Sequence, residues 1–168
     1  MGISGLLPLL ELVTRDNHVS CYKNKIVAID GYAWLHKAVY GCCIELATGL
    51  ESDKWITYCL NLIDMLLRNG VIVHMVFDGA NLPSKQITET LRASNRSAAL
   101  GKGLELIKTD KKKSLSFLSS SIDVTPRMAA ELMKRLRESR PEVPFLGTHD
   151  PYCRNSILRY DVYYCSYF

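Results

Sequence analysis

Two short, uninterrupted apolar stretches constrain the fold of this chain more than any other feature. Residues 25–29 read KIVAI and residues 71–77 read VIVHMVF, and both stretches are rich in β-branched side chains. A continuous run of this kind is typical of a strand buried on both faces, as in a parallel sheet covered by helices. Asp-Gly follows each run directly, at Asp30 and at Asp78. The pattern predicts two buried strands that each end at an aspartate.

The segment between the two strands has the periodicity of helices. Over residues 32–46 the apolar side chains recur at intervals of three and four, which predicts a packed helix that ends before Gly49. We expect Asp53 to cap a second helix over residues 54–68, which stops at Asn69-Gly70. Strand, helices and strand in this order predict a parallel α/β unit with a right-handed crossover.

Positive charge is concentrated after the second strand. Between residues 83 and 113 there are eight basic and three acidic residues, whereas the whole chain has a net charge of +4. A helix is expected over residues 85–108, with Lys85, Arg92 and Arg96 on one face. That face could attract phosphate, although a merely solvated helix surface accounts equally well for the charge.

The segments that follow have mixed composition. Gly101 and Gly103 have low helix propensity, so we expect the far end of the basic helix to be mobile. Residues 111–113, all lysine, open a Lys/Ser-rich stretch that we interpret as a solvated linker. Thr125-Pro126 predicts the start of a last helix, because a hydroxyl cap followed by proline favours helix initiation.

The two strand-end aspartates are the first candidates for chemistry. Ligands of open α/β sheets bind outside the carboxyl ends of the strands, and both Asp30 and Asp78 would lie at that edge. Carboxylate oxygens there would suit Mg²⁺ or Mn²⁺, which also bind substrate phosphate. A simpler interpretation is that each Asp-Gly is only a turn signal after a strand. The residues leave both interpretations open and name no reaction.

Composition excludes several other classes. Apolar residues make up 48% and charged residues 23% of the chain, as in ordinary globular domains. No run approaches the roughly 18 apolar residues of a membrane span, so we expect no membrane partner. The six cysteines form no CxxC pair and the four histidines are far apart in sequence, so no zinc site is expected. We expect the cysteines to be small buried side chains in a reducing compartment.

Four blocks of the sequence, in this order and spacing, resemble a known family. They read MGISGLLPLL from residue 1, VAIDGYAWLHK from residue 27, VFDGANLPSK from residue 76 and DVTPRMAAELMK from residue 123. Together they resemble the N-terminal part of the flap endonuclease/XPG (Rad2-type) superfamily of structure-specific nucleases, and most closely its exonuclease-one branch. The resemblance runs from residue 1 to about residue 139.

This resemblance implies a metal-dependent DNA nuclease of mismatch repair and recombination. Its activity would be a 5′ to 3′ exonuclease on duplex DNA or a 5′-flap endonuclease, with two Mg²⁺ ions, or Mn²⁺, over a PIN-like α/β core. The partners it implies are DNA with a 5′ end, nick, gap or flap, and mismatch-repair proteins. It further implies a monomer in the nucleus.

Individual site residues follow from the same resemblance. Asp30 and Asp78 match metal-binding carboxylates. Lys85 and Arg92 match catalytic residues of a basic helix that steer and polarise the scissile phosphodiester and also contact DNA. Gly2 matches the family's amino-terminal glycine near the active site, and Tyr32 and His36 match aromatic residues at the 5′ end; all three are expected to contact DNA. Arg96 is expected to contact DNA because it shares the basic helix face with Lys85 and Arg92. Tyr32 and His36 could equally be packing residues.

The last part of the chain departs from the family pattern. The family completes its metal site with a strand leading into a Glu and Asp block, a further Asp pair and later a helix-hairpin-helix element. Residues 140–168 contain Glu142, Asp150 and Asp161 without the Glu-x-Asp spacing. They also contain seven of the fifteen aromatic residues and no Ala, Lys or Met. We expect an incomplete core that lacks its later strands.

Domain and function predictions follow from this departure. We expect residues 1–99 to form the XPG-type nuclease domain with the metal-site strands, residues 100–139 to form an arch or linker and the next helix of the same core, and residues 140–168 to lie outside the native nuclease fold. The chain would then be a truncated nuclease with little or no activity by itself. A non-catalytic fragment that binds DNA or a repair partner is the alternative, and an unrelated α/β phosphatase or nucleotide-binding domain is a third, against which the lack of a P-loop or GxGxxG motif argues.

Overall fold

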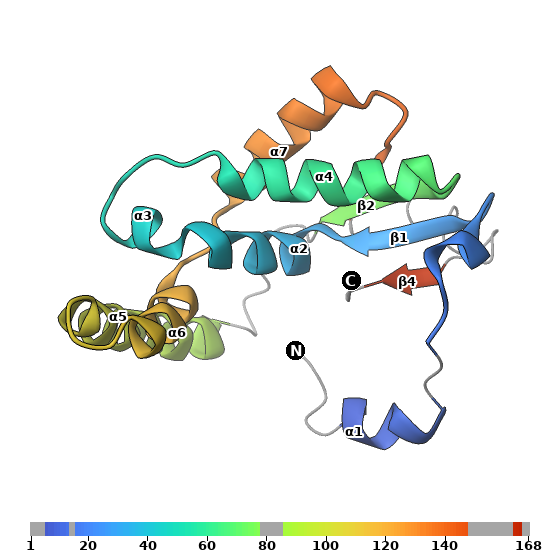
Figure 1. Ribbon diagram of the computed structural model, residues 1–168. Coiled ribbons are helices and arrows are strands. Elements are labelled where there is room, and N and C mark those ends of the chain that lie inside the picture. Colours follow the sequence, from blue (N-terminus) through green and yellow to red (C-terminus); the bar gives the residue numbers. More distant parts are fainter. Residues whose placement is uncertain (1–5, 14–15, 78–85, 148–162, 166–168) are drawn as a thin grey trace.

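A parallel sheet forms the centre of the molecule, with helices packed against it (Figure 1). The structure is a computed structural model that describes residues 6–13, 16–77, 86–147 and 163–165. Four strands pair in the order β3-β2-β1-β4. Their bounds are β1 (Ile26–Asp30), β2 (Ile72–Phe77), β3 (Phe145–Gly147) and β4 (Tyr163–Cys165). The predicted α/β class with a parallel sheet flanked by helices is confirmed.

Helices make up most of the remaining described chain. The α-helices are α1 (Leu6–Leu10), α2 (Gly31–Ala38), α3 (Cys43–Ala47), α4 (Lys54–Arg68), α5 (Gln86–Leu106), α6 (Lys111–Ser121) and α7 (Pro126–Ser139). Three short 3₁₀ turns are η1 (Glu11–Val13), η2 (Val19–Tyr22) and η3 (Val39–Cys42). Among these described helices, none combines the length and the apolar character needed to cross a membrane.

Both predicted strands are present, each within one residue of its expected position. They pair in parallel, and the register places Asp30 beside Val76. Alternate side chains of β1 and β2 enter one hydrophobic core: Val27, Ile29, Val73, Met75 and Phe77. Helices α2, α4 and α7 supply the other large buried side chains of this core: Trp34, Leu35, Ile63, Leu66, Leu132 and Leu136. The apolar runs in the sequence are therefore the centre of the packed core.

The predicted single helix over residues 32–46 is wrong in its continuity. Its apolar stripe is buried as expected, but the segment divides into α2, η3 and α3. The break lies at Cys42, whose φ of −134° is not helical, next to Gly41, a residue of low helix propensity. The stops predicted at Gly49 and Gly70 are confirmed, since both adopt left-handed backbone angles.

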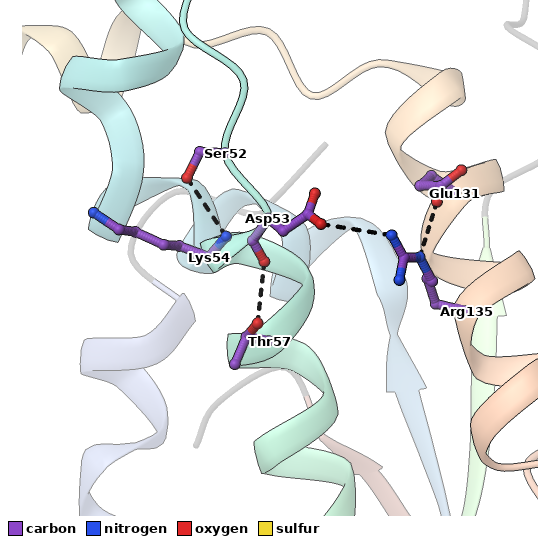
Figure 2. A network of polar contacts seen from close by, with 6 residues as sticks. All are labelled: Ser52, Asp53, Lys54, Thr57, Glu131 and Arg135. Atoms are coloured by element: carbon purple, nitrogen blue, oxygen red, sulfur yellow. Dashed lines mark hydrogen bonds and ion pairs between the residues drawn. The ribbon is translucent and has the colours of Figure 1, made fainter.

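Helix α4 begins where the sequence predicts, but Asp53 does not cap it with its side chain. The backbone of Asp53 lies outside the extended region that aims a capping side chain at the first turn. Its carboxylate instead accepts a bond from Arg135 of α7 at 3.5 Å, and Arg135 also pairs with Glu131 at 3.1 Å (Figure 2). The backbone carbonyl of Asp53 accepts from the Thr57 hydroxyl at 3.2 Å. This network joins the start of α4 to α7.

Helices α5 and α6 form a hairpin, and two predictions fail there. The stretch opened by the three lysines is helix α6 rather than a linker, because Asp110 accepts the Lys113 backbone N–H at 3.0 Å and caps it. The far end of α5 is packed rather than loosely held, since Gly103 lies against Leu118 and its carbonyl accepts the buried Ser114 hydroxyl at 2.7 Å. Figure 1 shows the two helices side by side, to one side of the sheet.

Two strands come from the segment that departs from the family pattern. β3 pairs with β2 and β4 pairs with β1, so both early strands have neighbours on each side. These pairings were not anticipated from the sequence. The assignment of residues 140–168 to a part outside the native nuclease fold, and the boundaries after residues 99 and 139, stay predictions.

Of the four cysteines whose burial the structure describes, Cys42, Cys43 and Cys59 are buried as expected and Cys21 is exposed. Burial raises the pKa of Cys42 and Cys43, and it raises the pKa of Cys59 to about 12. These thiols are therefore protonated near neutral pH and pack as small apolar groups.

Candidate active site

Asp30 lies at the carboxyl end of β1, where the chain passes from the sheet into α2. Its Oδ1 accepts the backbone N–H of Ala33 at 3.0 Å, so the carboxylate caps the helix. β1 is also the strand with β2 on one side and β4 on the other, the position at which α/β sheets bind ligands. The side chain thus has a structural task and a place at the binding edge of the sheet.

A cluster of aromatic rings packs next to Gly31, the residue that follows Asp30. A Cβ on Gly31 would lie 2.6 Å from Cζ of Phe77, so only glycine permits this close packing. The Tyr32 ring meets Phe77 edge to face, with 6.0 Å between centroids and 78° between planes. Phe77 also contacts Phe145 at 6.4 Å. Gly31 is therefore the first residue of α2 and a packing residue, not a turn signal.

Three predicted site residues lie outside the described residues: Gly2, Asp78 and Lys85. In the sequence Asp78 directly follows Phe77, the last residue of β2. The roles expected for these three residues stay predictions.

The basic residues of α5 form ion pairs with their neighbours. Arg92 and Arg96 both pair with Glu89, at 3.5 Å and 3.0 Å. Arg96 also reaches Asp123, in the connection between α6 and α7, at 3.5 Å. Arg96 is only 22% exposed, whereas Arg92 is 56% exposed. Of the two, Arg92 is better placed to meet a ligand from solvent.

His36 lies in α2, and charged groups from three other parts of the chain influence its pKa. Burial removes hydration from His36 and so lowers its pKa. The negative charges of Asp123 and Asp30 oppose this shift, and the positive charges of Arg96 and Arg92 reinforce it. All four charged groups are thus close enough to influence one imidazole. These charged groups come from β1, from α5 and from the connection between α6 and α7, and all influence the pKa of the same imidazole.

Carboxylates suit a hard cation at this edge, but the described residues supply few. A carboxylate that accepts one backbone N–H has further lone-pair directions through which it can bind a cation. Within the described part of the chain, no group of three or more His, Cys, Asp or Glu side chains is placed to hold a metal ion. Asp30 fits Mg²⁺ in donor type, and a complete site needs ligands from elsewhere.

Three residues near this site were not anticipated from the sequence. Glu89 could have been found, because it lies three and seven residues before Arg92 and Arg96 on the same helix. Phe77 was expected only as a strand residue, and its contact with Gly31 joins segments far apart in the chain. Asp123 carries no local signal for its pairing with Arg96, since the rest of α5 and the whole of α6 lie between them in the sequence.

Comparisons with known proteins agree on one family. The model of the XPG N-terminal domain matches residues 1–99. Exonuclease 1 of Danio rerio is 40% identical over 138 residues, covering 82% of this chain and 17% of that protein. Exodeoxyribonuclease 1 of Schizosaccharomyces pombe is 42% identical over 139 residues, covering 82% of this chain and 24% of that protein. The chain thus spans less than a quarter of the length of these relatives.

The fold comparison gives the same result. The catalytic core of Rad2 in complex with a DNA substrate matches with a TM-score of 0.52 and 19% sequence identity. The match covers 87% of this chain and 36% of the Rad2 chain. At this identity the likeness concerns the fold, which extends over nearly all of the chain.

Proposed function

The chain belongs to the XPG N-terminal domain family, and on this premise we propose that it carries part of a metal-dependent nuclease site for DNA. The observation that carries the proposal is the place of Asp30, whose carboxylate stands at the carboxyl end of β1, the edge at which α/β sheets bind ligands. Arg92 of α5 is exposed to solvent, and both residues influence the pKa of His36 on α2. A carboxylate that attracts cations beside a guanidinium that attracts phosphate is the combination that phosphodiester hydrolysis needs.

Mg²⁺, with Mn²⁺ as an alternative, would be held by Asp30 and Asp78. When bound, such an ion lowers the pKa of an attacking water and neutralises the leaving oxygen. The carboxylate of Asp30 is fixed by its bond to the Ala33 N–H, which orients the remaining lone pairs before any ligand arrives. Two carboxylates are few for a pair of metal ions, so further ligands are required.

Positive charge on α5 would orient the DNA backbone. Arg92 and Lys85 are proposed to contact the scissile phosphate, where a guanidinium binds two oxygens and an ammonium acts as a point charge. Arg96 would add to the field that attracts DNA. Because such contacts release counterions, DNA affinity should fall steeply with salt.

Stacking at the 5′ end is proposed for the residues of α2. Tyr32 and His36 lie one turn apart on this helix, next to the Asp30 edge. Their rings could hold an unpaired terminal base, since base stacking on aromatic side chains tolerates any sequence. Gly2 is proposed to lie near the same 5′ terminus.

The reaction we propose is 5′ to 3′ exonuclease cleavage of duplex DNA, or cleavage of 5′ flaps, in DNA repair. The names of the relatives, Exonuclease 1 and Exodeoxyribonuclease 1, support the exonuclease class. We propose a monomer that acts in the nucleus with mismatch-repair proteins. Since the match covers a small share of these relatives, and the described side chains form no group of three metal ligands, we expect slow cleavage or none by this chain alone.

Non-catalytic binding of DNA or of a repair partner is the second candidate. The absence of a three-ligand group among the described side chains favours it. Salt-dependent DNA binding without any Mg²⁺-dependent cleavage would identify this function.

The test uses the full chain, a 5′-phosphorylated duplex and Mg²⁺, with EDTA as the blank. Asp30→Asn removes the charge but keeps a good helix cap, and Asp53→Asn, at the start of α4, is the control. We expect salt-dependent binding, and any release of 5′ nucleotides should need Mg²⁺ and vanish in Asp30→Asn only. Failure to bind DNA at low salt, or cleavage that survives Asp30→Asn, would contradict the proposal.

A further inference from the structure

The two halves of α5 are held in different ways. Its C-terminal half packs against α6 through Gly103, Leu118 and the Ser114 hydroxyl. In its N-terminal half Leu91 is 62% exposed and Arg92 is also exposed, so the described contacts there bury little apolar surface. The position of this half, which carries the basic face, must depend on other interactions.

Ion pairs of Arg96 provide such an interaction. One guanidinium nitrogen, Nη2, lies 3.0 Å from Oε1 of Glu89 on the same helix and 3.5 Å from Oδ1 of Asp123. The first pair stays within α5. The second leaves the hairpin and reaches the connection between α6 and α7.

Asp123 belongs to a well-anchored part of that connection. Val124, the next residue, is 8% exposed and lies in the hydrophobic core. Thr125 then caps α7 by accepting the Met128 backbone N–H at 3.3 Å. Figure 1 shows this connection rising from the hairpin to α7. Asp123 thus presents a negative charge, next to a core residue, to the middle of α5, beyond the part that packs on α6.

We propose that Asp123 is a positioning residue that holds the middle of α5 to the connection between α6 and α7 through Arg96, and so orients the N-terminal half of α5. Asp123 touches neither substrate nor metal in this role. It fixes the direction of α5, and with it the direction of Arg92, one turn away. Only the orientation of Arg92 toward DNA rests on the proposed function. The tether itself, by which we mean the ion pair between Arg96 and Asp123, is a property of the folded chain. It also assigns Arg96 a structural partner besides DNA.

The test is hydrogen exchange of the full chain, followed over the peptides that cover residues 89–100. Asp123→Asn should speed exchange there by roughly two- to fivefold at low salt, the range expected for loss of a half-exposed ion pair. Exchange in β1 and α4 should stay unchanged. Asp53→Asn is the matched control, because its pair with Arg135 has the same length of 3.5 Å but lies away from α5.

Two further measurements separate a tether from a general loss of stability. Asp123→Glu keeps the charge and should return exchange in α5 close to the wild-type rate, and high salt should reduce the difference between wild type and Asp123→Asn. Unchanged exchange in Asp123→Asn, or an equal increase in Asp53→Asn, would overturn the proposal. DNA binding is measured separately, so a wild-type chain that fails to bind DNA would contradict the proposed function and leave the tether result intact.

Discussion

Asp30 combines a helix-capping hydrogen bond with a position suited to chemistry. A mutation of such a residue therefore changes both stability and binding. Its carboxylate caps α2 and stands at the end of the central strand. Asp30 could be identified as a candidate from the sequence because it directly follows the apolar run that forms β1. The packing of Gly31 under Phe77 was not visible, because no local pattern links residues so far apart in the chain.

Substitutions of Asp30 should separate its two roles. Asp30→Ala loses the cap and should lower the free energy of unfolding by about 1 kcal/mol, whereas Asp30→Asn retains an acceptor and should lower it by a few tenths. Urea unfolding of both variants measures the difference. Equal losses in the two variants would mean that the bond to the Ala33 N–H does not stabilise α2.

Gly31→Ala tests the close packing of Gly31 against the Phe77 ring. Its new methyl group would overlap the Phe77 ring, so we expect a loss of about 1–3 kcal/mol of stability from overpacking. Gly41→Ala is the control, since a Cβ at Gly41 meets nothing within 4 Å. Thermal unfolding should show a lower midpoint for Gly31→Ala alone, and similar midpoints for the two variants would contradict the packing.

Among the elements, α4, α5 and α7 lie close to their predicted bounds, whereas the stretch predicted as one helix over residues 32–46 is divided and α6 was not predicted. Helix α7 starts at Pro126 after the Thr125 cap, as the sequence predicts. Helix α6 was taken for a linker because its lysines and serines conceal the few apolar residues, such as Leu118, that pack on α5. Helix-helix pairing supplied the stability that composition did not reveal.

Gly103→Ala should loosen the hairpin of α5 and α6. A Cβ at Gly103 would lie 2.5 Å from Cδ2 of Leu118 and 3.2 Å from its backbone nitrogen, so α6 must move. Gly101→Ala, in the same helix with nothing within 4 Å, should instead be neutral or stabilising by up to about 1 kcal/mol. Urea unfolding should show a lower free energy of unfolding for Gly103→Ala and an unchanged or higher one for Gly101→Ala, and a destabilised Gly101→Ala with an unaffected Gly103→Ala would contradict this packing.

Arg140 and Asp64 make the link between α7 and α4 sensitive to acid. The Arg140 guanidinium donates to both oxygens of Asp64, at 2.5 Å and 2.8 Å, and this bonding lowers the pKa of Asp64 below its ordinary value of 3.8. A carboxylate with a lowered native pKa stabilises the fold above its unfolded pKa, and this contribution is lost as pH falls through the native value.

Asp64→Asn should therefore remove a pH-dependent part of the stability. Wild type should exceed Asp64→Asn in unfolding free energy at neutral pH, and the difference should shrink as pH falls below about 4. Urea unfolding across this range measures it. A difference that stays constant with pH would show that the pair does not titrate as described.

For the whole molecule, the sequence predicted the layered α/β architecture and one edge of the sheet as the place for chemistry. Parallel strands and helical crossovers follow from short-range patterns, so both were accessible. The pairing of β3 and β4 with the early strands was not, because these segments are three residues long and their partners lie far away in the chain. The ion pair between Asp123 and Arg96 was missed for the same reason, because the two residues are far apart in the sequence.

Binding of Mn²⁺ to the full chain tests the central proposal, a cation site shared by Asp30 and Asp78, most directly. The loss of the free Mn²⁺ resonance in electron paramagnetic resonance measures binding for wild type, Asp30→Asn, Asp78→Asn and the Asp53→Asn control. We predict binding by wild type and the control, and affinity lower by at least about tenfold in each edge variant, since affinity depends on ligand charge. Equal Mn²⁺ affinity in all four proteins would contradict it.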